Sequence, residues 1–157
     1  MPNPTVIHST FVIERNYPAP LERVYAAFTD PEKKVRWFAQ GGQTEVEKFE
    51  MDFRAGGTER TSWRFREGSR FPGVALVNEG VYQDIVPNKR IVMASNMTIG
   101  DHRMSASLMT FEFLLTESGT DLIVTHQGAF FEGSDGPQMR EEGWRKIIER
   151  LDAELAR

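Results

Sequence analysis

The chain has 157 residues, and its hydrophobic and charged fractions of 39% and 27% are ordinary for one globular domain. Its net charge of −4 argues against a nucleic-acid binder, because that function needs a basic face that displaces counterions. The chain has no cysteine, which excludes disulfides, thiolate catalysis and cysteine-ligated zinc. Neither a signal peptide nor a membrane-spanning apolar run is visible in the sequence, so we expect a cytoplasmic protein with no membrane or nucleic-acid partner.

The first quarter of the chain predicts one strand and two short helices. Residues 5–17 are rich in β-branched and aromatic side chains and predict a strand, whereas residues 1–5 are expected to be loosely held. The first helix has apolar residues at helical spacing: Leu21, Val24, Tyr25 and Phe28. Asp30 as N-cap and Pro31 in the first turn predict a second helix, which ends near residues 37–38.

Most of the chain between residues 44 and 128 predicts strands, because runs of alternating apolar residues are separated by turn residues. The expected strands span 44–50, 57–65, 74–86, 90–97, 104–116 and 121–128. The alternation is clearest in 104–116, where Met109 and Phe111 share one face. The last strand carries His126 on the same face as two apolar residues.

The C-terminal 21 residues predict a long amphipathic helix. Gly136 and Pro137 mark its start, because proline is tolerated in the first turn of a helix. Its apolar stripe follows helical spacing: Trp144, Ile147, Ile148, Leu151 and Leu155. Since nearly all the preceding elements are strands, this stripe is expected to pack against a sheet.

Six short sequence strings, in this order, resemble the helix-grip superfamily (START-like, Bet v 1-like, SRPBCC), and within it the activator of Hsp90 ATPase homologue 1-like family. The strings lie at 18–25, 30–38, 52–57, 80–87, 90–92 and 142–144. The resemblance implies a single α+β domain over residues 1–157. In that fold a curved antiparallel sheet of about seven strands wraps a long C-terminal helix, and two short helices follow the first strand.

The resemblance also implies a function, since members of the superfamily typically hold an apolar ligand between the sheet and the long helix. We therefore expect a small-molecule-binding protein with a cavity for an apolar or aromatic ligand. The candidate lining residues are large and apolar, with one histidine: Trp37, Phe38, Trp63, Tyr82, Met93, Phe111, His126, Phe130, Met139, Trp144 and Ile148. For most of the aromatic residues in this set, ordinary core packing is the favoured interpretation.

Two other classes of function stay open. One is an interaction module of the Hsp90 ATPase activator type with a role in the stress response, which needs a chaperone partner and an exposed patch. The other is a cyclase- or hydrolase-type enzyme; no catalytic motif is present, and His126 is its only candidate residue. The alternative for His126 is a buried histidine hydrogen-bonded to a neighbouring element. No metal site or cofactor is expected, because His8 and His102 do not cluster with His126. Both a monomer and a homodimer are compatible with the sequence.

Overall fold

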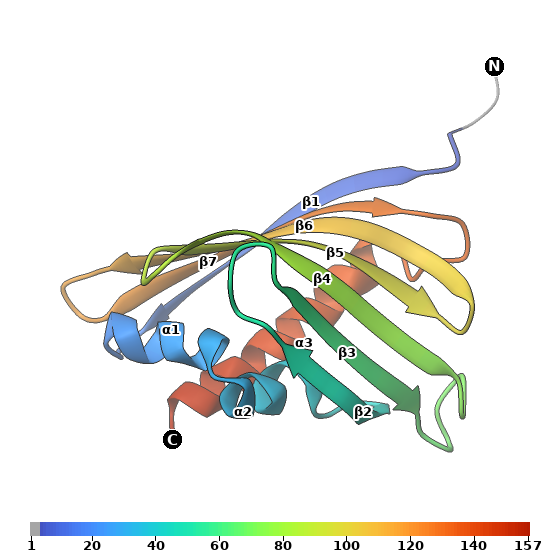
Figure 1. The fold of residues 1–157 in the computed structure, drawn as a ribbon, viewed down its shortest axis with the longest axis horizontal. Helices are drawn as coiled ribbons and strands as arrows, with labels where there is room; N and C mark the ends of the chain where they lie inside the picture. Colours follow the sequence, from blue (N-terminus) through green and yellow to red (C-terminus); the bar gives the residue numbers. More distant parts are fainter. Residues whose placement is uncertain (1–3) are drawn as a thin grey trace.

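The computed structural model describes residues 4–157 and contains one seven-stranded antiparallel sheet that curves around a long helix (Figure 1). The elements in chain order are β1 (Ile7–Tyr17), α1 (Leu21–Thr29), α2 (Pro31–Lys34), the π-helical turn η1 (Val35–Ala39), β2 (Thr44–Met51), β3 (Thr58–Phe65), β4 (Ala75–Val86), β5 (Arg90–Ile99), β6 (His102–Leu115), β7 (Thr120–Phe130) and α3 (Pro137–Leu155). The strand order is β1-β7-β6-β5-β4-β3-β2. The expected α+β helix-grip architecture is confirmed.

The two short helices follow β1 as expected, and the second one begins with the predicted cap. The Asp30 carboxylate accepts a hydrogen bond from the Glu32 backbone N–H at 3.0 Å, and Pro31 occupies the first turn. The helix then continues as the π-helical turn η1, which the sequence pattern did not indicate. Within this turn both Trp37 and Phe38 are buried, and the Trp37 indole N–H donates to the Ala27 carbonyl at 2.8 Å.

Helix α3 begins at Pro137, directly after Gly136, and runs beneath the concave face of the sheet (Figure 1). Of the predicted apolar stripe, Ile148, Leu151 and Leu155 are buried, while Trp144 and Ile147 are partly buried against the same core. The stripe therefore faces the sheet, as the helical spacing predicted. No helix within residues 4–157 has the length and apolar character needed to cross a membrane.

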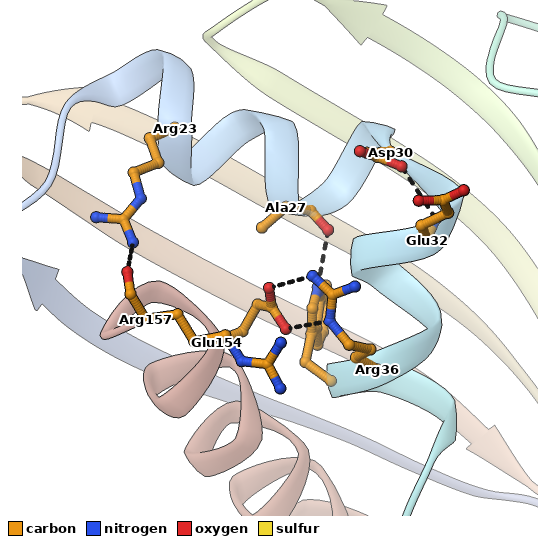
Figure 2. A network of polar contacts seen from close by, with 8 residues as sticks. Arg23, Ala27, Asp30, Glu32, Arg36, Glu154 and Arg157 are labelled. Atoms are coloured by element: carbon orange, nitrogen blue, oxygen red, sulfur yellow. Dashed lines mark hydrogen bonds and ion pairs between the residues drawn. The ribbon is translucent and has the colours of Figure 1, made fainter.

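Polar contacts attach the C-terminal end of α3 to the preceding helical segments (Figure 2). Arg36 of η1 donates two hydrogen bonds to the Glu154 carboxylate, at 2.8 and 2.7 Å. Arg23 of α1 donates to the Arg157 carbonyl at 2.8 Å. These contacts fix one end of α3, and the site described below lies under its other half.

Candidate functional site

A cavity of about 190 Å³ lies between the concave face of the sheet and the N-terminal half of α3. Its walls come from α2, η1, strands β3 to β7, the loop that precedes α3, and α3 itself. Eight of its eighteen lining residues are aromatic or methionine: Phe38, Trp63, Met93, Met97, Met109, Phe111, Met139 and Trp144. Such a composition is typical of pockets that hold apolar ligands.

The structure brings seven of the eleven candidate residues to the cavity wall: Phe38, Trp63, Met93, Phe111, His126, Met139 and Trp144. Tyr82, Trp37, Phe130 and Ile148 do not line it. Trp37 turns its indole toward Ala27, and Ile148 is fully buried in the core cluster. The apolar character of these four residues predicts a buried side chain, but it does not indicate whether that side chain borders a space.

The cavity owes its depth to a row of small residues that crosses the sheet. Gly80 of β4 is paired with Ser95 of β5, Ser95 with Ser107 of β6, and Ser107 with Gly128 of β7. Directly opposite residues in a sheet point to the same face, and Ser95 and Ser107 line the cavity. The neighbouring row carries large side chains, including His126. Gly80 and Gly128 do not belong to the cavity wall, because the Met93 side chain covers Gly80 and the His126 and Phe130 rings cover Gly128. The hollow in the concave face therefore lies over the two serines.

The helix contributes a second gap opposite this hollow. Gly143 lies in the interior of α3 and lines the cavity. A Cβ atom built at this position would meet no heavy atom within 4 Å. No steric contact therefore requires a glycine here, although glycine is unfavourable inside a helix.

Two buried charges form one polar end of the cavity. The Lys34 ammonium and the Glu59 carboxylate are 2.6 Å apart, and these residues are 3% and 2% exposed. The Tyr82 hydroxyl donates to the same carboxylate oxygen at 2.6 Å. Burial, together with the Glu59 charge, raises the pKa of Tyr82, so this hydroxyl remains a donor. The ammonium also lies 5.3 Å from the centre of the Phe38 ring, within cation–π range.

Sequence reasoning missed this ion pair, although one half of it left a signal. Glu59 alternates with Thr61 and Trp63 along β3, and all three side chains are buried. A charged residue on the apolar face of a strand indicates a buried partner. No local pattern marks Lys34 as that partner, because the two residues are 25 positions apart and belong to different elements.

A second ion pair borders the cavity near the N-terminus of α3. Arg140 donates to both carboxylate oxygens of Asp135, each at 2.8 Å, and to the Ser105 hydroxyl at 2.9 Å. Its guanidinium lies 5.1 Å from the centre of the Phe130 ring. Burial has the largest single effect on the pKa of Asp135 and raises it, but the hydrogen bonds and charge of Arg140, together with the Ser134 hydroxyl and a backbone hydrogen bond, outweigh burial and hold that pKa below its ordinary value.

His126 is 1% exposed, and its ring lines the cavity while stacking on Phe11 with the ring centres 4.7 Å apart. Its Nδ1 atom has no hydrogen-bond partner within residues 4–157. The interpretation of His126 as a histidine hydrogen-bonded to a neighbouring element is therefore wrong for this nitrogen. Burial, with a smaller effect of the nearby Arg140 charge, lowers the pKa of His126 to about 4, so the imidazole is neutral at pH 7.

The cavity reaches the surface at Met139, whose side chain lines it and is nevertheless 57% exposed. A surface groove of about 390 Å³ adjoins it and shares Met97, Asp135 and Met139 with its lining. Phe71 in the loop between β3 and β4 is 41% exposed and borders this groove. A ligand can therefore enter between this loop and the first turn of α3. Among the described residues, no group of three or more His, Asp or Glu side chains is placed to hold a metal ion.

A model of the family described as activator of Hsp90 ATPase homolog 1-like protein matches residues 18–156. The chain belongs to this family. Two solved structures of rhizobial proteins are similar along nearly the whole chain. Mll3558 from Rhizobium loti is 44% identical, with 95% of this chain and 98% of that chain covered and a TM-score of 0.84. A protein from Rhizobium leguminosarum is 36% identical, with 96% of both chains covered and a TM-score of 0.88.

More distant members share the fold alone. The AHSA1-like protein from Aeromonas hydrophila is 19% identical to this chain, with 94% of this chain and 92% of that chain covered, at a TM-score of 0.69. A comparison with proteins of curated function found no match. Membership in the family agrees with a ligand-binding or co-chaperone-like domain, and the geometry of the cavity has to distinguish between them.

Proposed function

We propose that this protein is a cytoplasmic binder of a small apolar or aromatic molecule, held in the cavity between the sheet and α3. The observation that supports the proposal is the cavity itself. It has a volume of about 190 Å³, and aromatic and methionine side chains form a large part of its wall. Protein interiors are otherwise close-packed. A ligand that fills this space would make the van der Waals contacts that a close-packed interior otherwise supplies.

The volume limits the size of the ligand. An engineered protein cavity of about 150 Å³ binds benzene, and pockets for drug-sized ligands are about 300–1,000 Å³. A cavity of about 190 Å³ therefore suits one aromatic ring with a few substituents. A longer molecule would have to extend past Met139 into the adjoining groove.

Thermal unfolding in the presence of aromatic compounds, aromatic acids and fatty acids tests the proposal. A compound present at 100 times its Kd stabilises the folded state by about 2.7 kcal/mol, which raises the melting temperature. Gly143→Leu is the matched variant, because its side chain would project into the cavity from an otherwise open position. The shift is expected in the wild type and should be absent in this variant. If no compound shifts the melting temperature of the wild type, the binding function is refuted.

An enzymatic role is the second candidate, and one observation favours it: the His126 ring lies in the cavity with Nδ1 unpartnered. The same burial that holds it there lowers its pKa to about 4. A general base works best when its pKa is near the operating pH, so this imidazole is a weak base at pH 7. Turnover of a bound compound, followed by mass spectrometry and lost in His126→Phe, would establish this role instead.

A co-chaperone role is the third candidate, favoured by the family and by apolar residues on the outer face of the sheet. Val81, Leu108 and Val12 are 38%, 37% and 46% exposed there, on β4, β6 and β1. Stimulation of Hsp90 ATPase activity by the purified protein, abolished in Val81→Lys/Leu108→Lys, would favour this role. Retention of ligand binding by that double variant would show that the two faces act independently.

A further inference from the structure

The charged residues of the cavity wall cancel one another. Lys34 pairs with Glu59 at 2.6 Å and Arg140 with Asp135 at 2.8 Å, and these four side chains are the charged groups that line the cavity. His126 adds no charge at pH 7, because burial keeps it neutral. The lining therefore carries no net charge. An ionised ligand would bring an unpaired charge into a mainly apolar enclosure, which is strongly unfavourable.

The wall also offers hydrogen-bonding groups that have no side-chain partner within residues 4–157. Ser95 and Ser107 face one another across β5 and β6, and Asn78 of β4 lies beside this pair. His126 belongs to the next row of the sheet, where it is paired with Met109. Buried polar atoms are nearly always hydrogen-bonded in native proteins. Four buried side-chain atoms within residues 4–157 are exceptions: the Nδ1 of His126 and the hydroxyls of Tyr25, Thr61 and Thr116. Of these four residues, His126 is the one that lines the cavity, so its ring is the candidate for contact with a ligand.

We propose that the ligand is an uncharged, single-ring compound with a hydroxyl group, of which phenols are the type. The hydroxyl group is oriented by His126 and the Ser95–Ser107 pair, while the ring packs on the aromatic and methionine side chains opposite them. A neutral imidazole has one nitrogen that accepts a hydrogen bond, and a serine hydroxyl can donate or accept. Phenols stay protonated at pH 7, since the phenolic pKa is about 10. This inference rests on the proposed binding function and defines the chemistry of its ligand.

Three probes of nearly equal shape separate hydrogen bonding from charge: p-cresol, toluene and 4-methylbenzoate. Their affinities at pH 7 would be measured by isothermal titration calorimetry, supported by ligand-observed NMR. We expect p-cresol to bind about 3–10-fold more tightly than toluene, the ratio that one neutral hydrogen bond supplies. We expect 4-methylbenzoate to bind at least 10-fold more weakly than p-cresol.

His126→Phe should reduce the preference for p-cresol over toluene by weakening p-cresol binding, while toluene binding is kept. Thr125→Ala is the control, because Thr125 is adjacent in β7 and points to the opposite face of the sheet. If His126→Phe does not fold, the double variant Ser95→Ala/Ser107→Ala provides the same test. It removes two hydroxyl groups without adding volume, so its preference for p-cresol over toluene should also be reduced.

Equal binding of p-cresol and toluene by the wild type would overturn the inference and leave the binding function intact. If 4-methylbenzoate binds most tightly of the three probes, the cavity accepts an ionised ligand. That result would overturn the inference that the ligand is an uncharged phenol. A wild type that binds none of the three probes but is stabilised by another compound of the thermal-shift panel would likewise overturn the ligand class alone. A preference for p-cresol that persists in both variants would show that these side chains do not orient the hydroxyl group.

Discussion

Gly143→Ala should stabilise the protein and weaken ligand binding in the same step. Replacing glycine by alanine in a helix interior gains about 0.8–1 kcal/mol. The new methyl group meets nothing within 4 Å and projects into the cavity, so it adds no steric cost. The expected gain is therefore about 0.8–1 kcal/mol. For a domain of this size, each kcal/mol corresponds to a rise in melting temperature of about 2–4 °C.

Gly136→Ala is the matched control, because a Cβ at Gly136 would also meet nothing within 4 Å. Gly136, however, has φ of +85°, which L-residues other than glycine rarely adopt. This variant should therefore lose about 1 kcal/mol or more. Urea unfolding of the three proteins, with p-cresol titrations in parallel, measures both effects. Unchanged or lowered stability of Gly143→Ala would refute the reasoning, since it would mean that the helix face at this position is already in contact.

Three further predictions concern stability. A chain that ends at Gly136 should be insoluble or lack a cooperative thermal transition, because it loses α3. Ile148, Leu151 and Leu155 of that helix contribute about 5–9 kcal/mol of gross apolar burial, and the partly buried Trp144 and Ile147 add to it. A cooperative transition would disprove this prediction. Lys34→Met should lower the free energy of unfolding, measured by chemical denaturation, by about 3–5 kcal/mol, because it leaves the Glu59 carboxylate buried without its partner. The double variant Lys34→Met/Glu59→Met should recover much of this loss. A Lys34→Met protein as stable as the wild type would contradict the prediction. The folded-state pKa of His126 is about 4, below its unfolded value of 6.5. The neutral His126 therefore contributes to stability above pH 6.5, and this contribution is lost as the pH drops toward 4. Between pH 6.5 and 4 the free energy of unfolding of the wild type should fall by up to about 3 kcal/mol more than that of His126→Phe. Equal losses of stability in the two proteins would show that His126 does not titrate as the structure implies.

The elements of this fold could be predicted from local pattern, because each one carries its own periodicity. The start of α3 at Pro137 and the cap at Asp30 followed from residue preferences at helix ends, and both are present in the structure. Strand β6 begins two residues before its expected start at 104, and β7 ends two residues after its expected end at 128. In both regions backbone pairing with a neighbouring strand continues beyond the expected limit.

The site was only partly predictable, because its depth and polarity depend on which residues lie opposite one another. The row from Gly80 to Gly128 is formed by the register of four strands, and no single strand shows it. The same limit applies to the Lys34–Glu59 pair, whose members belong to elements that meet only in the folded chain. The aromatic candidates are buried or partly buried in the structure, whereas Met139 is 57% exposed. The pattern of one strand or helix could not separate those that border the cavity from those, such as Trp37, that pack behind it.

The row of small residues determines where the size of the binding site can change during evolution or by design. Gly128 cannot be enlarged without displacing rings, since a Cβ there would lie 2.7 Å from Phe130 and 2.8 Å from His126. Ser95 and Ser107 already carry side chains toward the cavity from the middle of hydrogen-bonded strands. Larger or smaller residues at these two positions alter the volume while the strand backbones stay in place. Related proteins can therefore differ in the length and bulk of the ligand that they select through substitutions at these two positions, without any change in fold.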